Sequence, residues 1–323
     1  MYSRLFSLIP CLPLLWLFLS APIAEANQSE KGPPNPENLR SDLANLRNQA
    51  ARGDAMANYQ LGYSYMTGTG VSLNYSEAAK FLHVAAEKGL PEAELRLGYL
   101  YEHGEGLLRD YRKAFDYYAA AAKKGNLTAA NNLAAMYEYG RGVHKDIRQG
   151  VDWHRRAAEA GNVVAQCNMG ILYFRGRGVP QDYTQAAQWL RKAAENGYAP
   201  GQQILAWMYF MGKGVPQEYP MAAHWLQLAA QNGEPHAQTD LGYLYEQGRG
   251  VPLDYVTAYM WYKTAESGGD GRARKKLKSL SRLMTEQQIS QANAAATELS
   301  ASRPKGEVVE ESQSIGNAFM PER

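Results

Sequence analysis

One pattern of small, aliphatic and aromatic positions returns every 36 residues along the middle of the chain. It places a small residue first, a Leu or Met four positions later, a small residue directly after that, and a Tyr three positions further on. The aliphatic position is occupied by Leu61, Leu97, Leu133, Met169, Leu205 and Leu241. Spacings of three and four place such residues on one face of an α-helix. We call this predicted element helix A.

A second helical stripe follows each helix A at the same interval. Each copy has a large aromatic residue with Ala or Gly three positions before it and Ala four positions after it. The aromatic residues are Phe81, Tyr117, Trp153, Trp189, Trp225 and Trp261. We call this element helix B. In the second copy, the pattern predicts helix A over 92–103 and helix B over 111–124.

Glycines separate the predicted helices at fixed positions. A Gly-x-Gly pair follows each helix A, from Gly68 and Gly70 to Gly248 and Gly250, and a single glycine such as Gly89 follows each helix B. The end of a helix favours glycine because a left-handed cap tolerates no Cβ. A fixed period of two helices indicates a repeat array. The sequence therefore predicts an all-α solenoid of six 36-residue helix-turn-helix repeats over 57–272.

The order Leu-Gly-x-x-Tyr, Gly-x-Gly-Val, Asp-Tyr, Ala-x-x-Trp and Ala-Ala resembles the Sel1-like repeat (SLR) family, which is related to tetratricopeptide repeats. Residues 176–197 show the pattern most fully, whereas Ile147, Gly150 and Tyr259 depart from it. The resemblance implies a right-handed α–α superhelical solenoid with a concave groove lined by helix A. It also implies a non-enzymatic scaffold that binds a protein or peptide in that groove.

The start of the chain has the features of an export signal. Arg4 precedes an almost wholly apolar run over 5–19, and small residues at Ala24 and Ala26 predict cleavage after Ala26. The run is shorter than the roughly 20 apolar residues of a spanning helix, so a retained anchor is the weaker alternative. We expect an exported protein, periplasmic or secreted, with no transmembrane segment in the mature chain. The family also has members in the lumen of the endoplasmic reticulum, which is the minor alternative.

The segments outside the repeats complete the predicted organisation. A signal peptide over 1–26 is followed by a Pro-rich linker over 27–37 and an N-terminal capping helix over 38–56. A basic C-terminal capping helix over 273–301 precedes a tail over 302–323, which has too few large apolar residues to fold.

Composition and motifs limit the chemistry of the chain. The 34 basic and 32 acidic residues give a net charge of +2, which argues against nucleic-acid binding. The six histidines form no metal-binding spacing, and each Gly-x-Gly follows a helix rather than the strand of a phosphate loop. Of two cysteines, only Cys167 remains after cleavage, and a plain packed thiol is its simplest interpretation. We expect no metal, no cofactor and no catalytic residue.

The candidate binding residues lie on helix A. The positions two before, two after and five after the core Leu vary between repeats and share one face, which predicts the groove. Large apolar and aromatic residues gather there, chiefly in the fourth and fifth repeats. The predicted groove residues are Ile171, Phe174, Trp207, Phe210, Met211, Tyr243, Tyr99 and Tyr63. Alternatively, these side chains pack against neighbouring helices or the glycine loops.

A basic patch is the second candidate surface. Arg274, Lys275, Lys278 and Arg282 lie in the predicted C-terminal cap, in a run of six basic residues without an acidic one. The patch fits an anionic envelope surface or an acidic partner, and a solubilising cap face is the alternative.

Two other classes of function stay open alongside the adaptor. Cysteine-rich members of the family have been linked to β-lactam binding or hydrolysis, but this chain lacks their repeated cysteines. A cell-wall or β-lactam enzyme is therefore one alternative, and a structural subunit of an envelope or motility complex is the other.

Overall fold

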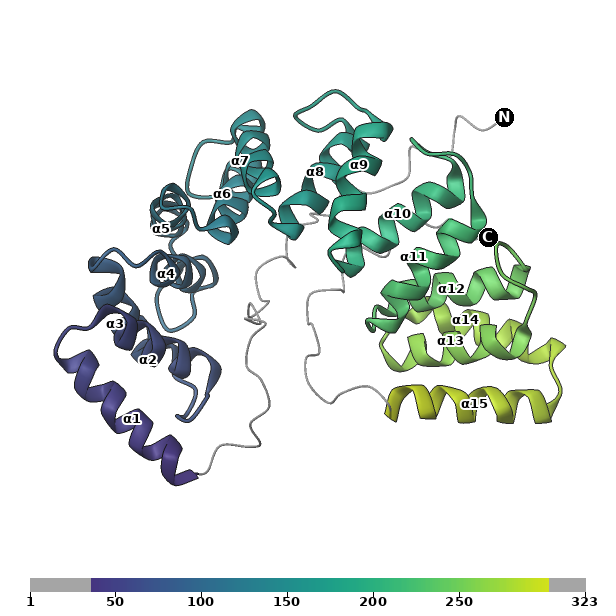
Figure 1. Cartoon of the computed structure of the whole chain (residues 1–323), viewed down its shortest axis with the longest axis horizontal. Helices are drawn as coiled ribbons and strands as arrows, with labels where there is room; N and C mark the ends of the chain where they lie inside the picture. The colour runs from purple at the N-terminus through teal and green to yellow at the C-terminus, as the bar shows by residue number, and fades with distance from the viewer. Residues whose placement is uncertain (1–35, 302–323) are drawn as a thin grey trace. The chain divides into compact units, whose positions relative to one another are not determined.

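The computed structural model describes residues 36–301, which form fifteen α-helices and one short 3-10 helix (Figure 1). The predicted signal peptide over 1–26, nearly all of the predicted linker and the predicted tail over 302–323 lie outside the described residues. The described part is wholly helical, as the repeat pattern predicts. None of its helices has the length and apolar character needed to cross a membrane.

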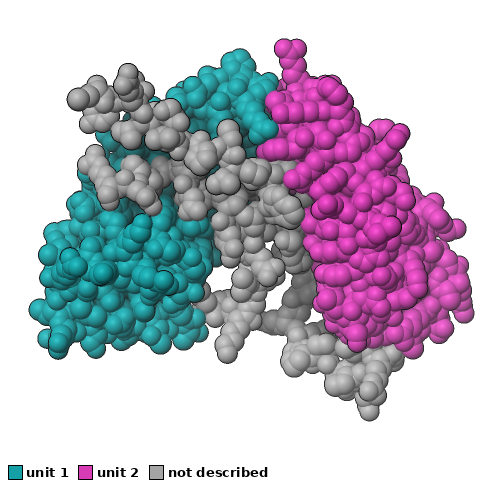
Figure 2. All heavy atoms as spheres, turned by 180° about the vertical axis from the view of Figure 1, so that it is seen from behind, with its two compact units in different colours: residues 1–21, 166–323 teal, residues 22–165 magenta. Residues whose placement is uncertain are grey.

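The chain divides into two compact units, shown in different colours in Figure 2. We call the described residues 36–165 the N-terminal unit and residues 166–301 the C-terminal unit. The helices of the N-terminal unit are α1 (Pro36–Ala51), α2 (Ala55–Thr67), α3 (Tyr75–Glu87), α4 (Pro91–His103), α5 (Tyr111–Lys123), α6 (Leu127–Tyr139) and α7 (Ile147–Glu159). Helix α8 (Val163–Arg175) begins at the boundary. The C-terminal unit continues with α9 (Tyr183–Glu195), α10 (Ala199–Met211), α11 (Tyr219–Gln231), α12 (Pro235–Gln247), α13 (Tyr255–Ser267), α14 (Gly271–Leu280), η1 (Ser281–Leu283) and α15 (Glu286–Ala301).

Helices A and B alternate as predicted. The even-numbered helices α2 to α12 are helix A, and the odd-numbered helices α3 to α13 are helix B. In the second repeat, α4 begins one residue before the predicted helix A and α5 ends one residue before the predicted end of helix B. The predicted N-terminal cap over 38–56 contains most of α1 and the first residues of α2.

Small residues on helix A let the two helices of a repeat approach closely. A Cβ atom added to Gly98 would lie 2.5 Å from the ring of Tyr118 on helix B, and one added to Gly242 would lie 2.8 Å from the ring of Tyr262. The core leucines beside these glycines, such as Leu97 and Leu241, are fully buried. Close packing of this kind leaves no room for a larger residue at the glycine position.

The glycine after helix B forms the predicted left-handed cap. Gly89 has a φ of +85°, and its N–H donates to Ala86 O (2.8 Å), while the N–H of Leu90 donates to Ala85 O (3.2 Å). These two bonds are those of a Schellman motif, which turns the chain from α3 into α4.

Within each unit, the second glycine of a loop joins one repeat to the preceding one. Gly214 has a φ of +68°, and a Cβ atom added there would lie 2.1 Å from the backbone oxygen of Tyr183, the first residue of α9. Gly142 approaches Tyr111 in the same way, at 2.0 Å. We call this the second-glycine contact. It explains the glycine pair in these loops: the first glycine ends helix A, and the second allows two repeats to touch.

The C-terminal segment differs from the single helix predicted over 273–301. The N–H of Thr285 donates to Gln288 Oε1 (2.9 Å), and the N–H of Gln288 donates to Thr285 Oγ1 (3.3 Å). This capping box starts a new helix at Glu286, and the cap is therefore two α-helices separated by η1. Helix α15 packs against α13, and its Leu299 contacts the core cluster that contains Trp261 (Figure 1).

The second-glycine contact can be tested by comparing two glycines in the C-terminal unit. Gly197 has a φ of +80° but open space around its Cβ position, so Gly197→Ala should cost about 1–2 kcal/mol from backbone strain alone. Gly214→Ala should lower the free energy of unfolding by about 1–3 kcal/mol more, because its methyl group also meets Tyr183. Urea denaturation of both variants provides the measurement, and equal losses would show that the contact between repeats adds nothing.

Candidate functional site

A row of aromatic side chains connects successive helices A in the C-terminal unit. Phe174 of α8 meets Trp207 of α10 at a centroid distance of 5.4 Å, and Phe210 of α10 meets Tyr243 of α12 at 6.4 Å. In each pair, the residue five after the core aliphatic residue contacts the residue two after it on the next helix A. We call these four residues the aromatic row.

The structure divides the predicted groove residues of this unit by accessibility. Met211 is exposed (41%), while Ile171, Phe174, Trp207 and Tyr243 are half-buried. Phe210 is only 7% exposed because it packs between the rings of Tyr219 and Tyr243. The prediction that Phe210 is open to a partner is therefore wrong, and Phe210 is the buried member of the row.

Cationic side chains border the aromatic row. The Lys213 ammonium lies 5.2 Å from the ring of Tyr183, and the Arg249 guanidinium lies 5.6 Å from the rings of both Phe210 and Tyr219. Lys276 of α14 lies 4.8 Å from the ring of Tyr243. Sequence reasoning missed Lys213 and Arg249, although both stand between the two glycines of a loop, and it counted Lys276 only in the basic run.

The two predicted residues of the N-terminal unit, Tyr63 and Tyr99, lie on α2 and α4. The ring of Tyr63 stacks on Tyr59 at 6.2 Å, and the Arg96 guanidinium lies 5.1 Å from it. The hydroxyl of Tyr99 donates to Glu105 at 3.4 Å. Burial raises the pKa of Tyr99, and the neighbouring Glu105 carboxylate raises it further. Both tyrosines are half-buried, with aromatic surface beside a cation.

The sequence predicts that the position five after the core residue of helix A varies freely between repeats. The structure shows that it does not. Where helix A carries Glu there, helix B of the same repeat carries a polar partner: the Tyr118 hydroxyl donates to Glu102 (3.0 Å), His154 lies 3.7 Å from Glu138, and the Tyr262 hydroxyl donates to Glu246. Where this position of helix A is apolar, the corresponding residue of helix B in the same repeat is Leu. These apolar pairs are Met66 with Leu82, Phe174 with Leu190 and Phe210 with Leu226. The variation at this position is therefore compensated inside each repeat.

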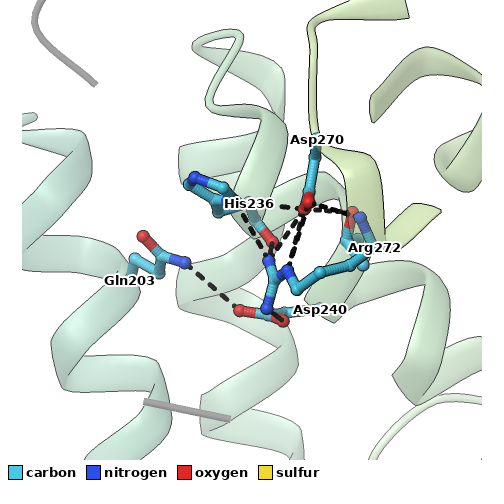
Figure 3. Close-up of polar contacts among 6 residues, drawn as sticks. Gln203, His236, Asp240, Asp270 and Arg272 are labelled. Carbon is cyan, nitrogen blue, oxygen red and sulfur yellow. Dashed lines mark hydrogen bonds and ion pairs between the residues drawn. The ribbon is translucent and has the colours of Figure 1, made fainter. Parts of the chain in front are cut away.

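The N-terminal half of α14 is fastened to α12 by a buried polar network (Figure 3). The Arg272 guanidinium donates to Asp270 Oδ2 (2.8 Å) and to Asp240 Oδ1 (3.2 Å). Asp240 also accepts from Gln203 of α10 (3.2 Å), and Asp270 accepts from Thr239 (2.7 Å). Arg272, the first residue of the basic run of six, is thus held by two carboxylates.

The pKa values of the two carboxylates in this network are shifted in opposite directions. Burial raises the pKa of Asp240, and the Arg272 charge offsets only part of that effect. Burial also acts to raise the pKa of Asp270, but hydrogen bonds from His236, Arg272 and Thr239 outweigh it and hold that pKa well below its usual value. The network is stable because its cation is present.

The predicted basic patch lies on the exposed side of α14 and on η1. Arg274, Lys275, Lys278 and Arg282 are all exposed, and the Arg274 side chain, 81% exposed, lies 3.4 Å from Glu266. Along the repeat, Arg274, Lys278 and Arg282 take the places of Gln238, Gly242 and Glu246 in α12. Gly242 contacts helix B of its own repeat, whereas α15 packs on α13. Charged residues therefore occupy the face on which the next helix would stack.

Cys167 is a buried free thiol on α8. Burial raises its pKa to about 12, which keeps the sulfur protonated near neutral pH. Within residues 36–301, no group of three or more His, Cys, Asp or Glu side chains is placed to hold a metal ion.

Comparison with known families gives a match over the whole array. The Sel1 repeat matches six consecutive segments, 55–90, 91–126, 127–162, 163–198, 199–234 and 235–270. No curated protein gives a significant match.

Two solved structures are similar in sequence and fold. A Sel1 repeat protein from Oxalobacter formigenes is 34% identical, with a TM-score of 0.64 over 74% of this chain and 99% of that chain. The protein c5321, a protective antigen present in uropathogenic Escherichia coli strains and displaying an SLR fold, is 28% identical, with a TM-score of 0.58 over 86% of this chain and 73% of that chain.

The polar network of Figure 3 can be tested by removing its cation. Arg272→Met should lower the free energy of unfolding by about 3–5 kcal/mol, because two buried carboxylates lose their counter-charge. Arg274→Met is the matched control and should change it by no more than about 0.5 kcal/mol, since that side chain is exposed.

An uncompensated buried carboxylate binds a proton more readily in the folded than in the unfolded chain. The deficit of Arg272→Met should therefore shrink as the pH falls from 8 towards 5. A deficit equal to that of Arg274→Met at every pH would contradict the assignment.

Proposed function

Because this chain belongs to the Sel1 repeat family, whose members are protein-interaction scaffolds, we propose that it is a non-enzymatic adaptor. Its partner is a protein or peptide that binds along the exposed face of helix A. The observation that supports this proposal most is the aromatic row of the C-terminal unit, with the exposed Met211 beside it.

The physical properties of the aromatic row suit protein recognition. Trp207 and Tyr243 are half-buried, so each presents part of a large ring while the rest is fixed by neighbouring helices. Aromatic residues held in this way lose little freedom on binding and are common at the energetic centres of interfaces. Burial of Phe210 beneath them contributes rigidity rather than contact area.

The charges around the row favour a particular kind of partner. The Lys213 ammonium lies over the ring of Tyr183. The Arg249 guanidinium lies over the rings of Phe210 and Tyr219. A partner segment with both apolar and acidic side chains would complement this combination of rings and cations.

We propose export to the periplasm or the extracellular medium as the location of this adaptor. The support is the sequence of residues 1–26, with Arg4, the apolar run and the small residues before the predicted cleavage point. The basic patch of Arg274, Lys275, Lys278 and Arg282 would then provide a second contact with an anionic envelope surface. Its support is the charged, uncovered end face of α14.

A photo-crosslinker at two positions of the fifth repeat tests the binding face. A benzoylphenylalanine at Met211, which is exposed beside the aromatic row, should capture the partner in the cell that makes this protein. The same group at His224, an exposed residue of α11 on helix B, should not capture it.

The captured protein then allows a quantitative measurement. Met211→Glu should weaken its binding about tenfold or more without altering the helical circular-dichroism signal, because a charge at an interface core is costly. Capture from His224 but not from Met211, or unchanged affinity of Met211→Glu, would contradict the proposed face.

A further inference from the structure

Arg96 lies on the helix A face of the N-terminal unit and makes no ion pair with any residue that the structure describes. It lies on α4, three residues before Tyr99, and its guanidinium lies 5.1 Å from the ring of Tyr63 on α2. The side chain is half-buried, and its Nε atom is buried without a hydrogen bond to any described residue. No ion pair with a described residue compensates its charge.

Two other half-buried arginines of the protein have carboxylate partners, whereas Arg249 lies over the rings of Phe210 and Tyr219. Arg141 donates to Glu102 at 3.1 Å, and Arg272 is held by Asp240 and Asp270. Burying a charge without a partner is unfavourable, and natural proteins usually pair such groups. Arg96 differs from Arg141 and Arg272 in this respect, and its buried Nε has no hydrogen-bond partner among the described residues.

The acidic residues near Arg96 do not pair with it. Glu105 accepts a hydrogen bond from Tyr99, and Glu92, one turn earlier on α4, is exposed and makes no ion pair with Arg96. The surroundings of the guanidinium are instead aromatic. Tyr59 stacks on Tyr63 at 6.2 Å, which fixes the ring beneath Arg96.

We propose that Arg96 binds a carboxylate of the partner, a Glu or Asp side chain in a segment that lies across Tyr63 and Tyr99. This inference rests on the proposed function and names the chemistry of its partner. A guanidinium presents parallel N–H donors that match the two oxygens of a carboxylate, and such charge-assisted bonds are the stronger kind. The ring of Tyr63 holds the guanidinium in place before the partner arrives, so little freedom is lost on binding.

Arginine side-chain NMR on the full chain tests the site directly. The probe is an acetylated, amidated peptide, Gly-Glu-Tyr-Glu-Gly, and its control is the same peptide with Gln in place of Glu. The Nε–H signal of Arg96 should shift saturably with the Glu peptide, with about tenfold weaker binding of the Gln peptide. The internal control is Arg156, which lies 5.0 Å from the ring of Trp153 on helix B and should not respond.

Variants separate binding from a purely structural role. Arg96→Gln should abolish the preference for the Glu peptide and leave the melting temperature unchanged or higher, since it removes an unpaired charge and breaks no ion pair. Arg156→Gln should keep the preference. Equal responses of Arg96 and Arg156, no response of Arg96, or a lower melting temperature of Arg96→Gln with the preference intact would each overturn the assignment.

The outcome is distinguishable from a failure of the proposed function. If the protein captured from Met211 binds wild type and Arg96→Gln equally, the carboxylate assignment is wrong and the scaffold proposal stands. If Arg96 selects the Glu peptide but nothing is captured from Met211, the carboxylate site stands and the aromatic row is not the partner surface.

Discussion

Within each unit, the packing of successive repeats depends on the contact between the second glycine of a loop and the first residue of the preceding helix B. Gly142 and Gly214 come so close to Tyr111 and Tyr183 that no side chain fits between them. Because this contact recurs at one position of the repeat, the spacing between successive helices A is fixed within each unit. Phe174 can therefore meet Trp207, and Phe210 can meet Tyr243, through the same pair of positions. Any surface built on helix A inherits its geometry from the loop glycines.

Within this fixed frame, the interior of each repeat uses one of two solutions. A Glu on helix A pairs with Tyr or His on helix B, as in Glu102 with Tyr118, or an apolar residue packs with Leu. The polar solution costs desolvation that hydrogen bonds must offset, and it brings further partners such as Arg141 and Lys276. The apolar solution frees the rings of the fourth and fifth repeats to form the aromatic row. Whether the exposed face of helix A is polar or aromatic thus depends partly on which of the two residue pairs fills the interior of the repeat.

Much of this structure can be predicted from the sequence because the repeat is strict. The period and the glycines placed the ends of α4 and α5 within one residue. The variation at the Phe210 position alone suggests an open groove. Its correlation with the Leu226 position of helix B, 16 residues later in each repeat, indicates instead that the two residues pack inside the repeat. The capping box of Thr285 and Gln288 is a local signal in the sequence, and it divides the C-terminal cap into two helices. The pairing of Arg272 with Asp240 spans 32 residues between two helices and has no local signal.

Helix A is the proposed face for recognition of a partner, and helix B supports it. Hydroxyl-radical footprinting with and without the captured partner tests this division most directly, because it reports the solvent access of individual side chains. We expect protection of Trp207, Met211 and Tyr243, with Trp189 and His224 on helix B unchanged. Protection of Trp189 and His224 with the helix A residues unaffected would contradict the account.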